Sequence, residues 1–225
     1  MGHVKLNGAL RRDPGTPVHI GKDRIEMDGK PLGRSEKIYL ALNKPRGVVT
    51  TASDEKGRET VYAYLPGDLP WVAPVGRLDK ASEGLLIVTN DSEWAARLSA
   101  PETHLVKTYH VQVGTIADEL LLGALQKGVR SEDGNLLRVK RVSILRLGER
   151  NSWIEIVLDE GKNRQIRRML EHFKIEVLRL VRVTIGPLKL GDLPKGATRP
   201  LGQEEKRALD RAMRAPNREP ASYVP

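Results

Sequence analysis

The chain has 225 residues, of which 39% are hydrophobic and 30% are charged, and it contains no cysteine. This composition is typical of a folded globular protein, and it excludes disulfides, thiolate nucleophiles and cysteine-ligated zinc or iron–sulfur sites. Lysine and arginine number 38 against 29 acidic residues, a net charge of +9 that favours a polyanionic partner such as a nucleic acid. A basic protein without such a partner is the alternative, because total charge barely separates the two.

Neither a membrane anchor nor a metal site is indicated. No apolar run approaches the roughly 20 residues of a membrane helix, and the first residues lack the apolar core of a signal peptide. The five histidines are scattered, with no i,i+4 pair and no HExxH sequence, so we expect no bound catalytic metal, and a magnesium ion held by carboxylates stays open as the alternative. The sequence predicts a cytoplasmic protein with no membrane partner.

Residues 1–36 are expected to form a small β-rich unit. Strands are predicted over residues 4–6 and 24–27, with one turn within residues 10–16 and another within 27–31, where proline, glycine and aspartate cluster. Such a unit is too small to hold a core of its own. Residues 31–37 are predicted to be a linker.

The main domain is predicted to span residues 37–202. An unbroken apolar run over residues 84–89 is typical of a central strand that is covered on both faces. Because strands dominate and do not alternate regularly with helices, we predict an α+β fold with a mixed, mainly antiparallel sheet. Further strands are expected over residues 38–43, 106–113, 139–147, 153–158 and 177–185. One helix is expected from Asp91 or Ser92 to Leu98, and another around residues 163–173. A third is expected to be capped by Thr115, to end at Gly128 and to carry Ile116, Leu120, Ala124 and Leu125. Residues 203–225 are expected to be a polar, flexible tail with a short surface helix at 203–214.

Asp79 lies in the segment 76–84, GRLDKASEG, directly before the buried strand. Loops beside rigid strands are common places for reactive groups. An aspartate before a strand is more often a turn or cap residue, and an Arg-x-Asp pair such as Arg77 and Asp79 is usually a surface ion pair. The spacing alone therefore favours a structural role.

The segment 162–173 predicts an amphipathic helix with a basic face. Its apolar residues 166, 169, 170 and 173 follow the i, i+3, i+4, i+7 pattern and are expected to face the core. Arg164, Arg167 and Arg168 fall on the opposite stripe, which suits phosphate binding at a helix start. A solvated basic face is the ordinary alternative.

Tyr109 lies within a predicted strand of a chain that has only five tyrosines. A tyrosine in a strand most often packs in the core. In a nucleic-acid enzyme it can instead stack on a base. Taken alone, Tyr109 is better explained as a residue that packs in the core.

Taken together, these segments resemble the RsuA/RluB/RluE/RluF family of ribosomal RNA pseudouridine synthases. The resemblance runs from about Ile38 to about Leu201, and five motifs in family order are far more specific than any one of them. The motifs are residues 42–50 (LNKPRGVVT), 74–86 (PVGRLDKASEGLL), 107–109 (KTY), 160–169 (EGKNRQIRRM) and 182–188 (RVTIGPL).

The resemblance implies a pseudouridine synthase fold and a role for each site residue. Asp79 is expected to be the catalytic aspartate, as nucleophile or as base, and to act without metal or other cofactor. The substrate-binding residues that it implies are Arg77 near the flipped nucleotide, Tyr109 stacked on the uracil, Ile166 near the base and Arg167 paired with Asp79. From the charge stripe we expect Lys162, Arg164 and Arg168 to contact the RNA backbone.

Residues 1–36 also resemble the C-terminal half of an S4 RNA-binding domain, through residues 4–8 (VKLNG), 13–16 (DPGT) and 25–31 (IEMDGKP). The helices that normally precede this half have no counterpart among residues 1–36. We therefore expect a truncated S4-like unit that does not bind RNA independently.

The predicted partner is ribosomal RNA or an assembling ribosomal subunit, with 23S RNA favoured over 16S RNA and a monomer expected. Two other functions stay open: a non-catalytic ribosome-binding or assembly factor, and a generic basic RNA-binding module. The presence of Asp79, Tyr109 and Arg167 together favours the enzyme.

Overall fold

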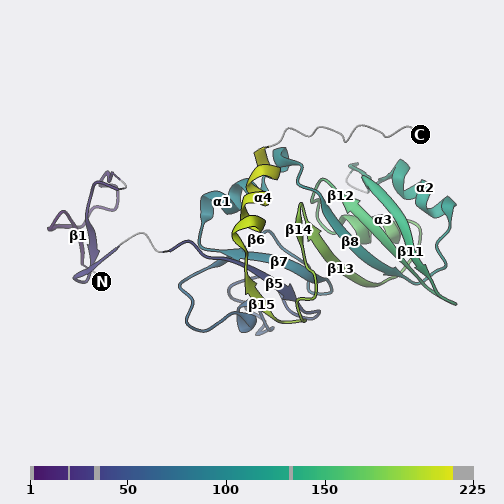
Figure 1. The fold of residues 1–225 in the computed structure, drawn as a ribbon, viewed down its shortest axis with the longest axis horizontal. Helices are drawn as coiled ribbons and strands as arrows, with labels where there is room; N and C mark the ends of the chain where they lie inside the picture. The colour runs from purple at the N-terminus through teal and green to yellow at the C-terminus, as the bar shows by residue number, and fades with distance from the viewer. Residues whose placement is uncertain (1–2, 20, 33–35, 132–133, 215–225) are drawn as a thin grey trace. The chain divides into compact units, whose positions relative to one another are not determined.

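The chain forms two compact units, residues 1–37 and 38–225. The computed structural model describes residues 3–19, 21–32, 36–131 and 134–214. Figure 1 shows the strands and helices of both units along the chain. The predicted linker falls partly outside the described residues.

The first unit is a four-stranded antiparallel sheet in the order β2-β1-β3-β4. Two tight hairpins build it, because Asn7 and Gly8, and likewise Asp28 and Gly29, adopt the positive φ angles that two-residue turns require. No side chain of this unit is buried among residues 3–19, 21–32 and 36–37, so these residues form no core. Its strands are β1 Val4–Leu6, β2 Ala9–Arg11, β3 Ile25–Met27 and β4 Lys30–Pro31.

The turn predicted within residues 10–16 is confirmed at Asp13–Thr16, where Thr16 N–H donates to the Asp13 carbonyl at 3.2 Å. Strand β2 occupies Ala9–Arg11, and its register pairs Leu10 with Lys5. The Asn7-Gly8 turn reverses the chain earlier, since both residues tolerate the left-handed region. The S4-like character of this unit stays a prediction.

The second unit is built on a nine-stranded mixed sheet in the order β11-β12-β8-β13-β7-β5-β15, with β14 paired to β13 and β6 to β7 (Figure 1). All described pairings in it are antiparallel except that of β13 with β7. The strands are β5 Tyr39–Lys44, β6 Ala73–Val75, β7 Glu83–Thr89, β8 Lys107–Val113, β11 Arg141–Leu147, β12 Ser152–Leu158, β13 Val177–Ile185, β14 Leu188–Lys189 and β15 Thr198–Pro200. A separate ladder pairs β9 Val129–Arg130 with β10 Leu136–Leu137.

The parallel pair β7–β13 positions the site. Its register sets Arg182 of β13 beside Gly84 of β7. Gly84 has φ +101°, and a Cβ there would lie 2.3 Å from the Arg182 carbonyl oxygen, so only glycine fits. The loop before β7, which carries Asp79, is thereby brought against β13.

Helices cover the sheet at both ends. The helices α2 and α3 lie over the β8–β11–β12 end, and α1 and α4 lie over the β5–β6–β7 end (Figure 1). None of the described helices is long and apolar enough to cross a membrane. The helices are α1 Ser92–Ser99, α2 Glu119–Lys127, α3 Gln165–His172 and α4 Gln203–Arg214, with 3₁₀ turns η1 Val61–Tyr64 and η2 Pro101–Thr103.

Helix α2 begins later than predicted. Its N-cap is Asp118, whose carboxylate accepts from Leu121 N–H at 2.8 Å, so Thr115 is not the cap. The shift changes the buried face, because Leu122 is buried whereas Leu120 is 83% exposed. Ile116, also placed on the helix, precedes it and is 45% exposed.

The short helix predicted over residues 203–214 is confirmed as α4, but it is docked on the domain and is not part of a flexible tail. Helix α4 packs on the core through Leu209, which has no exposed surface. The indole N–H of Trp94 in α1 donates to the Asp210 carboxylate at 2.8 Å. The apolar seam of α4 is narrow, so its composition resembles that of a solvated segment. Residues 215–225 lie outside the described residues.

Candidate active site

The loop between β6 and β7 carries Asp79 and is held by hydrogen bonds. Gly47 N–H donates to the Lys80 carbonyl at 2.7 Å, and Ser82 N–H donates to the Asp79 carbonyl at 2.9 Å. The Asp79 side chain, 24% exposed, therefore projects from a fixed backbone.

A buried lysine supports the same loop. Lys44 ends β5 with no exposed surface, and its ammonium donates to the carbonyls of Ser82 at 2.8 Å and Pro45 at 2.9 Å. Burial lowers the pKa of Lys44 to about 8, although the charges of Glu83 and Asp79 oppose the shift. The sequence analysis assigned this lysine no role. The sequence feature that could have revealed this lysine is a positive charge at the end of an otherwise apolar strand.

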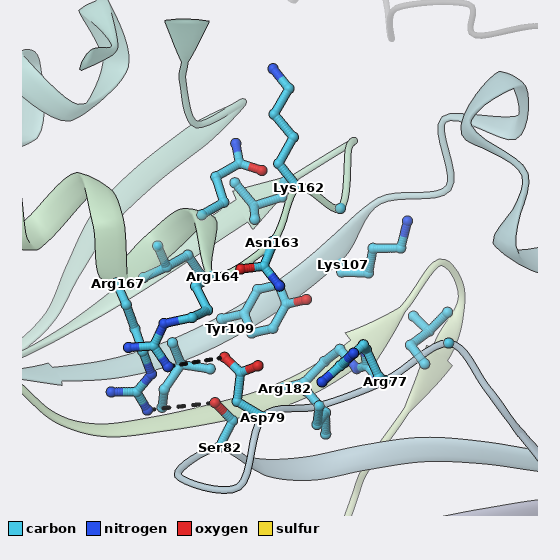
Figure 2. Close-up of a pocket in the computed structure, with 18 of the residues that line it drawn as sticks. Arg77, Asp79, Ser82, Lys107, Tyr109, Lys162, Asn163, Arg164, Arg167 and Arg182 are labelled. Atoms are coloured by element: carbon cyan, nitrogen blue, oxygen red, sulfur yellow. Dashed lines mark hydrogen bonds and ion pairs between the residues drawn. The ribbon is translucent and has the colours of Figure 1, made fainter. Parts of the chain in front are cut away.

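The cation beside the Asp79 carboxylate is Arg164. Its Nη1 lies 3.8 Å from Oδ2 of Asp79, and Figure 2 shows the two side chains pointing toward each other. Arg164 is the N-cap of α3 and has φ +48°, in the left-handed region. The helix therefore begins after it, and its side chain turns toward the loop rather than along the helix face.

Arg167, the residue predicted to pair with Asp79, is bonded elsewhere. Its Nη2 donates to the Ala81 carbonyl at 3.0 Å and lies 3.5 Å from the Ser82 hydroxyl (Figure 2). Burial lowers its pKa, and the nearby Arg164 charge adds to this while Asp79 opposes it. The prediction that Arg164, Arg167 and Arg168 share one face of the helix is thus wrong, because Arg164 precedes the helix and Arg167 faces the loop.

A hollow of about 360 Å³ opens beside Asp79. Tyr109 of β8 is half-buried in its wall, and Ile166 of α3 is 4% exposed there. A cavity of this size suits a single flipped nucleotide base with its sugar. Of the predicted site residues, the hollow brings together Arg77, Asp79, Tyr109, Lys162, Arg164, Ile166 and Arg167.

Residues 38–172, which include the Asp79 loop, Tyr109 and all of α3, match the family model of RNA pseudouridylate synthases. The chain belongs to the RNA pseudouridylate synthase family. It is an isomerase of that family.

Named relatives and a solved structure agree with this assignment. The chain is 38% identical over 209 residues to the ribosomal large subunit pseudouridine synthase B of Bacillus subtilis, covering 92% of this chain and 85% of that protein. It is 36% identical over 190 residues to the ribosomal large subunit pseudouridine synthase E of Vibrio vulnificus, covering 79% and 80%. A crystal structure of a pseudouridylate synthase superposes with a TM-score of 0.69 at 28% identity, covering 92% and 88%. The predicted RsuA/RluB/RluE-type family and α+β synthase fold are confirmed.

A second hollow of about 560 Å³ adjoins the first in this enzyme. Arg77, Leu78, Asp79 and Arg164 line both, so the Asp79 loop forms the wall between them. Residues 49–58 form the rest of its rim together with Lys80. The sequence analysis missed this part of the surface, because its polar residues read as an ordinary loop.

Lys162 and Arg168, which are predicted to contact the RNA backbone, differ in where they lie relative to the hollow. Lys162 lines the hollow, but its ammonium is bonded within the protein, to the Leu136 carbonyl at 2.9 Å and to Glu160 Oε2 at 3.0 Å. Arg168 is half-buried on α3 and does not line the hollow, because one further residue turns it about 100° away from Arg167. Their RNA contacts stay predictions.

A buried acidic network underlies the loop and was not predicted. Glu83, 2% exposed, accepts from Arg179 at 2.8 and 3.1 Å and pairs with the Lys195 ammonium at 2.7 Å. Burial alone would raise the pKa of Glu83, but the bonds from Arg179 and Lys195 outweigh it and lower the pKa to about 2. Glu83 thus joins the start of β7 to β13.

Proposed function

We propose that this enzyme isomerises a uridine of ribosomal RNA to pseudouridine, with 23S RNA favoured over 16S RNA, and that Asp79 is the catalytic carboxylate. The observation that carries the proposal is the position of Asp79 on a rigid loop, at the wall of a nucleotide-sized hollow with Arg164 beside it. The names of the Bacillus and Vibrio relatives support the large-subunit target.

The reaction needs groups of the kind that this hollow holds. The C1′–N1 bond breaks, the uracil turns, C5 bonds to C1′, and the C5 proton is lost while N1 gains one. The conversion is redox-neutral, and one carboxylate acting as nucleophile or base is sufficient when the nucleotide is held in place. Tyr109, half-buried in the wall, offers a ring on which the flipped uracil stacks.

The second hollow offers a path for the strand beside the target nucleotide. Arg77 and Arg164 lie at the wall between the hollows, and Lys56 and Lys80 line the second. These cations suit the phosphates of neighbouring nucleotides. We propose that the enzyme acts in the cytoplasm as a monomer on ribosomal RNA or an assembling subunit, with residues 1–36 as a partial S4-like appendage.

Tritium release tests the reaction. The full chain is incubated with 23S and 16S transcripts carrying tritium at C5 of uridine, and with the corresponding ribosomal particles. Release is expected from one RNA class, and Asp79→Asn is expected to lower the rate by about a thousandfold or more. RNA affinity should change by less than about threefold, since the substitution removes a negative charge near a polyanion.

Asp68→Asn is the matched control, because Asp68 is exposed and lies outside both hollows. It should release tritium at the wild-type rate. No release from transcripts or particles, together with retained RNA binding, would favour the non-catalytic assembly factor. Release by Asp79→Asn at the wild-type rate would refute the role of Asp79.

A further inference from the structure

Two cations from neighbouring strands lie in the wall of the first hollow, and the proposed reaction gives neither a role. Lys107 and Tyr109 are two residues apart on β8, so their side chains leave the same face of the sheet. Arg182 of β13 is the cross-strand partner of Tyr109. All three line the hollow, where Figure 2 shows Lys107 and Arg182 together with Asp79.

Arg182 has an unused donor. The residue is 6% exposed, and its Nε donates to the Leu85 carbonyl at 2.7 Å, which fixes the guanidinium. Its Nη2 is buried and has no hydrogen-bond partner among the described residues. A buried charged donor without an acceptor is costly, so a site that keeps one is suited to a ligand that supplies the acceptor.

Lys107 lacks a direct partner as well. No hydrogen bond or ion pair joins its ammonium to another of the described residues. Burial lowers the pKa of Lys107, the charge of Arg182 lowers it further, and Asp159 opposes both. Asp159 itself lies 3.7 Å from the Lys140 ammonium, so its charge is shared. Two cations of like sign thus share one wall without a dedicated carboxylate.

We propose that Lys107 and Arg182 bind the phosphate attached to the target nucleotide. The inference rests on the proposed function, because it takes the hollow as the uridine site. A phosphate supplies a negative charge and two non-bridging oxygens, one for each cation. A uracil carbonyl supplies one neutral oxygen and would leave the repulsion between the cations in place.

The subsite gives Lys107 and Arg182 a positioning role. While the glycosidic bond is broken, the uracil must turn within the hollow, and Tyr109 can follow it only by stacking. By binding the phosphate, Lys107 and Arg182 would keep the ribose beside Asp79 while the uracil rotates. Binding energy from a part of the substrate that does not react is thereby used to hold the reacting carbon in place.

Binding of mononucleotides tests the subsite directly. The full chain is titrated calorimetrically with uridine, uridine 5′-monophosphate and uridine 3′-monophosphate. One of the monophosphates is expected to bind about tenfold tighter than uridine, as hydrogen bonds to charged groups imply. Lys107→Met keeps the apolar stem, and Arg182→Lys keeps the charge but loses the fork of donors. Each should reduce the advantage to about twofold or less, with thermal unfolding confirming that the variants fold.

Lys127→Met is the matched control, since Lys127 is exposed on α2 and lies outside the hollow. It should keep the full phosphate advantage. Equal affinity for all three ligands, including no measurable binding of any, overturns the subsite, as does an advantage that survives both variants. Tritium release without phosphate discrimination contradicts the subsite alone. Discrimination without tritium release from any RNA contradicts the proposed reaction alone.

Discussion

The guanidinium of Arg164 lies 3.8 Å from the Asp79 carboxylate, although the two residues are 85 positions apart and Arg164 stands just outside α3. The left-handed backbone of Arg164 allows this, because the helix begins only after that residue. Arg167, inside the helix, reaches the loop backbone instead. One arginine thus faces the reacting group, and the other holds the loop that carries it.

Arg164→Gln is expected to slow the single-turnover rate of tritium release by about tenfold to a hundredfold, because it removes the charge beside the carboxylate. RNA binding should weaken modestly. The slope of log affinity against log salt concentration should become shallower by the amount that corresponds to about one phosphate contact. Arg164→Lys should recover part of the rate. Arg150→Gln, at an exposed site outside both hollows, should match the wild type. An unchanged rate for Arg164→Gln would remove Arg164 from the mechanism.

Replacing Tyr109 separates its ring from its hydroxyl. Tyr109→Leu should weaken turnover at low RNA concentration by roughly tenfold or more, since stacking on a base contributes about 1–3 kcal/mol. Tyr109→Phe keeps the ring and should stay within about threefold of wild type. Multiple-turnover kinetics on the 23S substrate measure both variants. Equal loss in both would show that the hydroxyl, not stacking, matters.

Glu83 makes stability depend on acidic pH. Its pKa is about 2 in the folded state against an ordinary value of 4.5, so its stabilisation is fully present above about pH 4.5 and disappears as pH falls toward 2. The side chain is 3% exposed, and the shift corresponds to roughly 3 kcal/mol. Denaturant unfolding across this range should show a steep loss in wild type and a flatter one in Glu83→Gln.

Glu149→Gln is the control for that measurement, because Glu149 is exposed. It should reproduce the wild-type acid profile. If Glu83→Gln loses stability between pH 4.5 and 2 as steeply as wild type does, the network with Arg179 and Lys195 is not the cause.

Leu209 tests whether α4 is part of the folded domain. Leu209→Ala should lower the free energy of unfolding by about 2–4 kcal/mol, because a fully buried leucine leaves a cavity. Leu120→Ala, at a site 83% exposed, should change it by less than about 0.5 kcal/mol. Chemical denaturation compares the two variants. Equal values would mean that α4 does not stabilise the core.

Local patterns in the sequence were enough to predict most strands and the family. The apolar run at residues 84–89 became the fully buried strand β7, and the alternation at 153–158 became the partly buried strand β12, because side-chain periodicity is set by the backbone of each element. Asp79 and Tyr109 were singled out through ordered motifs. The error at Thr115 came from choosing one polar residue among several neighbours as the helix cap.

Contacts across the chain were decided by the tertiary structure. The parallel register of β7 with β13 places Arg182 beside Gly84, and nothing in either strand encodes that partner. The pairing of Arg164 with Asp79 depends on a single left-handed residue, and the docking of α4 depends on Leu209 finding the core. Periodicity reports which face of an element is apolar. Which other element covers that face is settled by long-range packing and burial.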